Sequence, residues 1–138
     1  MLRSGNGMHA VDTNLLVRVI SADEAVQSPN ARQFIADHHV FVAKMVLLEC
    51  EWVLRKTYGL TRESIYGHLR DLAGLAQVTV ETPDQVANAL DWFVQGMDFA
   101  DALHLAAAMQ AGCEALATFD RKLAAAARKV GAGGVELL

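Results

Sequence analysis

The amino-acid sequence predicts an α/β fold with a central, mostly parallel sheet of four to five short strands. Short apolar runs alternate with longer stretches of helical periodicity, and strands joined through helices form right-handed parallel crossovers. The 138 residues are 53% hydrophobic and 20% charged, which is the composition of a packed globular protein. We therefore expect one domain over residues 8–138, after a disordered or non-native N-terminal extension over residues 1–7.

The expected elements follow one another in regular order. Proline marks two helix starts, where Ser28 precedes Pro29 and Thr82 precedes Pro83, so Ser28 and Thr82 are expected N-caps. Apolar runs predict strands at residues 9–11, 40–43, 78–80, 115–118 and 135–137. Helical spacing predicts helices near residues 13–20, 29–38, 45–58, 61–75, 83–95, 98–110 and 121–127.

Composition excludes several classes of protein. A net charge of -4 argues against a protein whose main task is to coat nucleic acid, because that task needs clustered Lys and Arg. A nuclease stays open, since a bound cation can attract the phosphate. Two cysteines, Cys50 and Cys113, form neither a disulfide framework nor a zinc pattern. Without an apolar run long enough for a membrane span or a signal peptide, we expect a cytoplasmic protein.

Two aspartates follow expected strands directly. Asp12 and Asp120 lie where the carboxyl ends of parallel strands form the usual ligand-binding edge. Aspartate is also a good helix N-cap and turn residue, and Asn14 offers a second cap for the first helix. Position alone therefore leaves a structural role and a site role open for both residues.

Glu49 differs from the other acidic residues in its helical neighbours. Because they are apolar, we expect Glu49 on a buried stripe, where a carboxylate is paired, protonated or bound to a metal. A structural ion pair is the alternative. Glu51 has Arg55 four residues later and is expected to form an exposed ion pair. The residues three and four positions from Glu49 are Met45, Val46, Trp52 and Val53.

A third acidic group starts a helix. Asp98 can be its N-cap with Asp101 at the third helical position, an arrangement that the helix dipole favours. Asp101 lies between two alanines, whose small side chains let a ligand approach. His104 is a weaker candidate ligand, because a histidine on a helix surface is more often neither ligand nor catalyst.

Together these carboxylates indicate an oxygen-rich site. Oxygen ligands without a Cys or His pair favour Mg²⁺ or Mn²⁺ over zinc. The predicted catalytic and metal-binding residues are Asp12, Glu49, Asp101 and Asp120, with Asp98 as a further candidate ligand.

The acidic residues fall in four segments that resemble motifs of the PIN-domain family. Residues 8–14 resemble its opening strand with the first acidic residue, carried here by Asp12. Residues 47–55 resemble its helix with the motif glutamate, which falls on Glu49 rather than Glu51.

The remaining two motifs lie in the C-terminal half. Residues 98–104 resemble the third acidic motif, whose metal-side aspartate maps to Asp101, and residues 118–120 resemble the fourth, with Asp120. Four motifs in this order make the chain similar to the PIN-domain family along nearly its whole length from Met8 onward.

This resemblance implies a fold and an activity. The fold is a three-layer α/β/α arrangement around the sheet, and the activity is Mg²⁺- or Mn²⁺-dependent endonucleolytic hydrolysis of RNA phosphodiesters. Asn14 and Thr118 match polar positions that shape the acidic pocket. Arg121 and Lys122 are candidate phosphate-binding residues, although a solvated basic pair explains them equally well.

The resemblance also implies partners. Bacterial members of this size are usually toxins of VapBC-type toxin–antitoxin pairs, which are held inactive by a VapB-like antitoxin and commonly form homodimers. RNA is then the substrate, and no membrane is involved.

Two other functions remain open. A haloacid-dehalogenase-like phosphatase would use Asp12 as its nucleophile, but that family expects a second aspartate where this chain has Asn14. A catalytically inactive PIN-like binding module is the other alternative, and the four filled acidic positions weigh against it.

Overall fold

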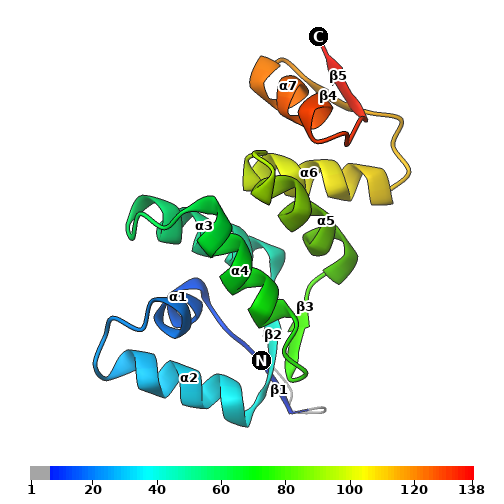
Figure 1. Ribbon diagram of the computed structural model, residues 1–138. Coiled ribbons are helices and arrows are strands. Elements are labelled where there is room, and N and C mark those ends of the chain that lie inside the picture. Colours follow the sequence, from blue (N-terminus) through cyan, green and yellow to red (C-terminus); the bar gives the residue numbers. More distant parts are fainter. Residues whose placement is uncertain (1–6) are drawn as a thin grey trace. The chain divides into compact units, whose positions relative to one another are not determined.

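The computed structural model describes residues 7–138, and the chain divides into two compact units (Figure 1). The first unit ends at Pro83 and the second is Asp84–Leu138. The predicted extension over residues 1–7 lies outside the described residues except for Gly7, and the single domain over residues 8–138 stays a prediction. Within residues 7–138, no helix has both the length and the apolar character needed to cross a membrane.

The first unit is built around a parallel sheet in which β2 is the middle strand. Val40 of β2 lies opposite both His9 and Val78 in register, and both Val40 and Val42 are fully buried. The strands are β1 (Met8–Ala10), β2 (His39–Val42) and β3 (Val78–Val80). The helices are α1 (Thr13–Ser21), α2 (Gln27–Asp37), α3 (Lys44–Lys56) and α4 (Arg62–Ala73).

The second unit pairs a small sheet with helices. Strands β4 and β5 are parallel, with Ala117 opposite Glu136. Its core includes the rings of Phe93 and Phe99, which meet edge to face with centroids 5.4 Å apart. The elements are α5 (Pro83–Val94), α6 (Phe99–Gln110), β4 (Leu116–Thr118), α7 (Arg121–Lys129) and β5 (Val135–Leu137).

The predicted α/β fold class is confirmed, because five short strands alternate with helices and every strand pair is parallel. The strands form a three-stranded and a two-stranded sheet, whereas the sequence predicted one central sheet. Strands of three or four residues carry too few alternating side chains to specify which strands become neighbours. The sequence therefore indicates the strands but not their pairing.

The two N-caps expected before the prolines, Ser28 and Thr82, do not cap their helices as predicted. Helix α2 begins before Ser28, and the Glu24 carboxylate accepts hydrogen bonds from the backbone N–H groups of Val26 at 3.0 Å and Gln27 at 2.5 Å. Ser28 is buried inside the first turn. Helix α5 begins where expected, but the buried hydroxyl of Thr82 finds no hydrogen-bond partner among residues 7–138. Thr82 also has a φ of 44°, a conformation that β-branched residues rarely adopt.

Candidate functional site

Asp12 connects β1 to α1. Its backbone is extended and its Oδ1 accepts a hydrogen bond of 2.9 Å from the backbone N–H of Leu15, so Asp12 is the N-cap of α1. Asn14, the alternative cap, is exposed in the first turn of the helix. The cap fixes the Asp12 carboxylate at the end of β1, on the edge of the sheet where ligand sites of parallel sheets gather.

Glu49 is exposed on α3, so the prediction that it lies on a buried stripe is wrong. Its Oε1 accepts a hydrogen bond of 2.9 Å from the hydroxyl of Thr13, the first residue of α1. Because Thr13 follows Asp12 directly, this contact holds Glu49 close to the start of the helix that Asp12 caps. The first unit therefore brings these two predicted ligands to one place.

The buried carboxylate of α3 is Glu51, which is 2% exposed. The Arg55 Nε lies 2.7 Å from Glu51 Oε2, so the predicted ion pair exists but is not exposed at its acidic end. Met45 and Trp52, which define the apolar neighbourhood of Glu49, are 69% and 54% exposed. The sequence prediction failed because apolar side chains lie on both faces of this helix. Its buried positions are Leu47, Cys50, Glu51 and Leu54.

The second unit holds the other predicted carboxylates. Asp98 is the N-cap of α6, and its Oδ2 accepts a hydrogen bond of 3.1 Å from the backbone N–H of Asp101. Asp120 is the N-cap of α7, and its Oδ1 accepts from the N–H groups of Lys122 at 2.8 Å and Leu123 at 3.2 Å. Asp98 and Asp120 thus act as helix N-caps, as predicted. A cap can also be a metal ligand, so this finding does not decide between the two roles.

The charges of both caps, Asp98 and Asp120, act on the carboxyl group of Asp101. Partial burial raises the pKa of Asp101, and the charges of Asp98 and Asp120 raise it further, while His104 lowers it. Like charges that raise a pKa in this way disfavour ionisation of the central carboxyl and favour a cation beside it. Within the second unit, Asp98, Asp101 and Asp120 therefore form one acidic group. His104 itself is exposed on α6.

Thr118 supports this acidic group from the end of β4. Its hydroxyl oxygen accepts a hydrogen bond of 3.0 Å from the backbone N–H of Asp120, which fixes the turn between β4 and α7. Arg121 and Lys122 are exposed in the first turn of α7, next to Asp120. Because both side chains are exposed, a phosphate group can reach them.

The predicted residues thus fall into two groups, with Asp12 and Glu49 in the first unit and Asp98, Asp101 and Asp120 in the second. Among residues 7–138, no three His, Cys, Asp or Glu side chains are placed to hold one metal ion. A metal site formed by Asp12, Glu49, Asp101 and Asp120 stays a prediction.

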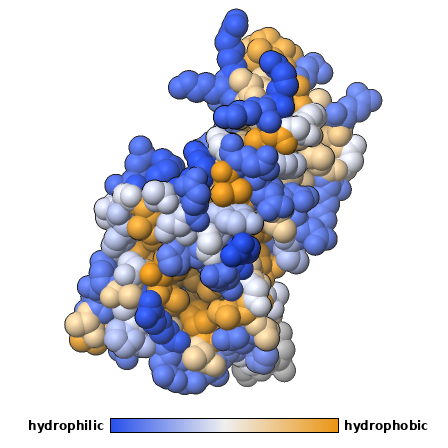
Figure 2. Space-filling view, in the orientation of Figure 1, coloured by the Kyte–Doolittle hydropathy of each residue, from blue (hydrophilic) through white to orange (hydrophobic). Residues whose placement is uncertain are grey.

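One feature beside Asp12 was not predicted from the sequence. A pocket of about 360 Å³ lies between α1 and α2, and in the same part of the molecule Figure 2 shows apolar surface bordered by hydrophilic surface. The spacing of its residues on each helix, three or four positions apart, was the available signal. The polar and aromatic residues that line it are Asp12, Asn14, Arg18, Gln27, Asn30 and Phe34.

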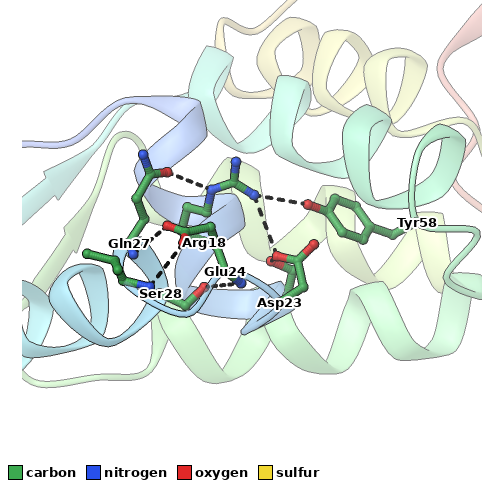
Figure 3. Close-up of polar contacts among 8 residues, drawn as sticks. Arg18, Asp23, Glu24, Gln27, Ser28 and Tyr58 are labelled. Atoms are coloured by element: carbon green, nitrogen blue, oxygen red, sulfur yellow. Dashed lines mark hydrogen bonds and ion pairs between the residues drawn. The ribbon is translucent and has the colours of Figure 1, made fainter.

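Arg18 is the only cation of this pocket lining and is held by several partners (Figure 3). Its Nε donates to Gln27 Oε1 at 2.9 Å, and its Nη1 lies 3.3 Å from the Tyr58 hydroxyl and 3.5 Å from Asp23 Oδ1. These contacts fix the guanidinium and neutralise its charge.

This chain is similar to proteins of known structure and family. A crystal structure of the toxin VapC20 from Mycobacterium tuberculosis, described as cleaving the sarcin–ricin loop, is 22% identical. That match covers 86% of this chain and 94% of VapC20, with a TM-score of 0.43. No curated protein sequence matches this chain. The family model of the PIN domain matches residues 10–129, which is most of the 138-residue chain, and the protein therefore belongs to the PIN domain family.

Proposed function

We propose that this protein is a Mg²⁺- or Mn²⁺-dependent endoribonuclease that hydrolyses RNA phosphodiesters in the cytoplasm. Membership of the PIN domain family supports a nuclease. The observation that carries the proposal is the placement of Asp98 and Asp120 as the N-caps of α6 and α7, with Asp101 in the first turn of α6. In agreement with this placement, burial and the charges of Asp98 and Asp120 raise the pKa of Asp101. Such crowding of carboxylates is costly unless a cation or a proton compensates it.

The donor chemistry fits a hard divalent cation. Every proposed ligand is a carboxylate oxygen, and Mg²⁺ and Mn²⁺ prefer oxygen ligands. The proposed ligands are those that the motif resemblance indicates, Asp12, Glu49, Asp101 and Asp120, with Asp98 as a further candidate. A bound cation would supply Lewis acidity to the attacking water and positive charge to offset the negative charge on the phosphate.

The protein's own groups position the other participants. The Asp12 and Asp120 caps fix two carboxylates at the starts of α1 and α7, so these carboxylates lose little freedom when a ligand binds. The Thr13 hydroxyl orients Glu49. Asn14 and Thr118 would shape the pocket, and Arg121 and Lys122 would bind a flanking phosphate.

We further propose that the nuclease is the toxin of a VapBC-type pair. An antitoxin of the VapB type would then cover the acidic site, and the toxin would act as a homodimer. The resemblance of the four acidic motifs to those of such toxins supports this step. Expression of the wild-type protein should inhibit growth, and co-expression of a cognate antitoxin gene should abolish that inhibition. Expression of the Asp101→Asn variant alone should not inhibit growth.

Cleavage of RNA by the purified protein tests the proposed activity. Incubation of total RNA with and without Mg²⁺ or Mn²⁺ should give fragments only with metal. A phosphatase that uses Asp12 would instead release phosphate from small esters and leave RNA intact. A binding module would bind RNA and cleave neither substrate.

A further inference from the structure

We propose that the pocket between α1 and α2 binds one nucleobase of single-stranded RNA next to the cleavage position. This inference rests on the proposed function, because it places the base beside Asp12. Asp12 is part of the pocket lining. A base held there therefore belongs to a nucleotide close to the phosphate that the acidic residues would act on.

The walls of the pocket are apolar. Leu15 of α1 and Ala31 and Phe34 of α2 line it, and Ala31 is buried at 7% exposure. Flat apolar walls suit the faces of a nucleobase, and proteins commonly recognise unpaired bases by packing them against aromatic rings. A volume of about 360 Å³ is in the range of small-ligand pockets and accommodates one base.

Phe34 is held firmly in place. Its ring stacks on His38 with centroids 4.1 Å apart and an interplanar angle of 17°, and the His9 ring meets it edge to face at 5.5 Å. The His38 Nδ1 lies 2.9 Å from the backbone carbonyl of Phe34, which fixes the stacked pair. A ring held on a helix by two neighbours is a preorganised surface for a second aromatic group.

Amide side chains at the rim suit the polar edge of a base. Asn14, Gln27 and Asn30 are exposed and each carries both donors and an acceptor. The Gln27 amide is oriented, because Arg18 can only donate and so faces its Oε1 at 2.9 Å (Figure 3). The Gln27 NH₂ group is then the donor for a ligand. At the positions where guanine and uracil carry the carbonyl acceptors O6 and O4, adenine and cytosine carry amino groups, so a contact of this donor with that position favours guanine and uracil.

The charge of the pocket argues against an anion as its ligand. Arg18 is the only cationic side chain in the lining, and it is already paired with Asp23 at 3.5 Å, while Asp12 adds a negative charge. A free phosphate or carboxylate would meet no unpaired cation there. A neutral base in a polar-rimmed apolar pocket meets no such penalty.

Binding of single neutral nucleosides to the metal-free protein tests this proposal separately from cleavage. We expect guanosine and uridine to bind more tightly than adenosine and cytidine and to shift the NMR signals of α1 and α2. The Phe34→Ala variant should bind at least tenfold more weakly, because base stacking on an aromatic ring is lost. Asn30→Ala changes an exposed residue of the lining, so the fold is expected to tolerate it, and this variant should also bind more weakly. Gln33→Ala, exposed on the same helix outside the pocket, should bind as the wild type does.

The outcomes separate the two proposals. If nucleosides bind with this pattern but RNA is never cleaved, the base pocket stands and the nuclease proposal fails. If RNA is cleaved and no nucleoside shifts these signals, the base pocket is wrong while the nuclease stands. Binding that Phe34→Ala and Asn30→Ala leave unchanged also overturns the pocket. If either of these two results overturns base binding, an apolar side chain of a peptide becomes the better candidate for this pocket.

Discussion

The Thr13 hydroxyl donates a hydrogen bond of 2.9 Å to Glu49 Oε1 and thereby ties the start of α1 to the middle of α3. Thr13 does not itself belong to the proposed ligand set. It orients Glu49, which, unlike Asp12, is not held by a helix cap. Replacing a group that orients a metal ligand in this way typically lowers metal affinity by about tenfold or more.

Replacing Thr13 should therefore weaken metal binding without removing a carboxylate. We expect Thr13→Val to lower the affinity for Mn²⁺ by about tenfold or more, because Glu49 loses its oriented hydrogen bond. Thr13→Ser keeps the hydroxyl and is the matched control. Calorimetric titration of each variant with Mn²⁺ measures the effect. Equal affinities in all three proteins would remove Thr13 from the account.

Substitutions that affect the two glutamates of α3 should have different effects: one should lower stability and the other should abolish activity. Arg55→Ala leaves the Glu51 carboxylate buried without its ion pair and should cost about 3 kcal/mol of unfolding free energy. Glu49→Gln lies on the surface and should change the unfolding free energy by less than about 0.5 kcal/mol while abolishing metal-dependent cleavage. Urea denaturation and RNA cleavage measure the two effects. Strong destabilisation by Glu49→Gln would instead support a structural role.

The same pair of residues shows how far sequence reasoning reached. The motif resemblance placed the ligand on Glu49, but the periodicity argument for its burial was wrong. Met45 and Trp52 are exposed, so an apolar residue three or four positions away does not establish a core face. Burial depends on which face of α3 packs against the rest of the unit, and only the three-dimensional arrangement supplies that information.

Other elements were predictable for local reasons. The caps at Asp12, Asp98 and Asp120 follow from one residue type at a strand-to-helix or loop-to-helix junction. The α1–α2 pocket was not predicted, because its residues come from two helices and none of them forms a motif by itself. The cap of α2 was also missed, since Glu24 reaches its N–H groups from a preceding loop.

The raised pKa of Asp101 predicts a pH dependence for the metal-free protein. Burial is its main cause, and repulsion from Asp98 and Asp120 adds to it. Because the folded state holds the proton more tightly than the unfolded state, the free energy of unfolding falls as pH rises from the ordinary aspartate pKa through the raised one.

Asp101→Asn removes this titration. The stability of the variant relative to wild type should therefore increase across that pH window and then stay constant up to neutral pH. Urea denaturation from pH 3 to pH 7 without metal measures the difference. A difference that does not vary with pH would show that Asp101 ionises normally.

The two cysteines should differ sharply in reactivity. Cys113 is exposed, whereas burial, with a contribution from Glu51, raises the pKa of the buried Cys50 thiol to about 12. Thiolate is the reactive form, so an alkylating reagent at pH 8 should modify Cys113 alone in the folded protein and both thiols after denaturation. Mass spectrometry of the labelled peptides gives the result. Rapid labelling of Cys50 in the folded protein would contradict its burial.

The measurement that tests the central proposal most directly is cleavage of total RNA by purified, partner-free protein beside an Asp12→Asn, Asp101→Asn double variant. Asparagine is preferable to alanine at position 12, because it retains the cap of α1, whose loss would cost about 1 kcal/mol. We expect cleavage that requires Mg²⁺ or Mn²⁺ and is lost in the variant, with both proteins equally folded by circular dichroism. Cleavage that persists in the variant, or no cleavage by folded wild-type protein with metal, would contradict the assignment of these carboxylates to a ribonuclease site.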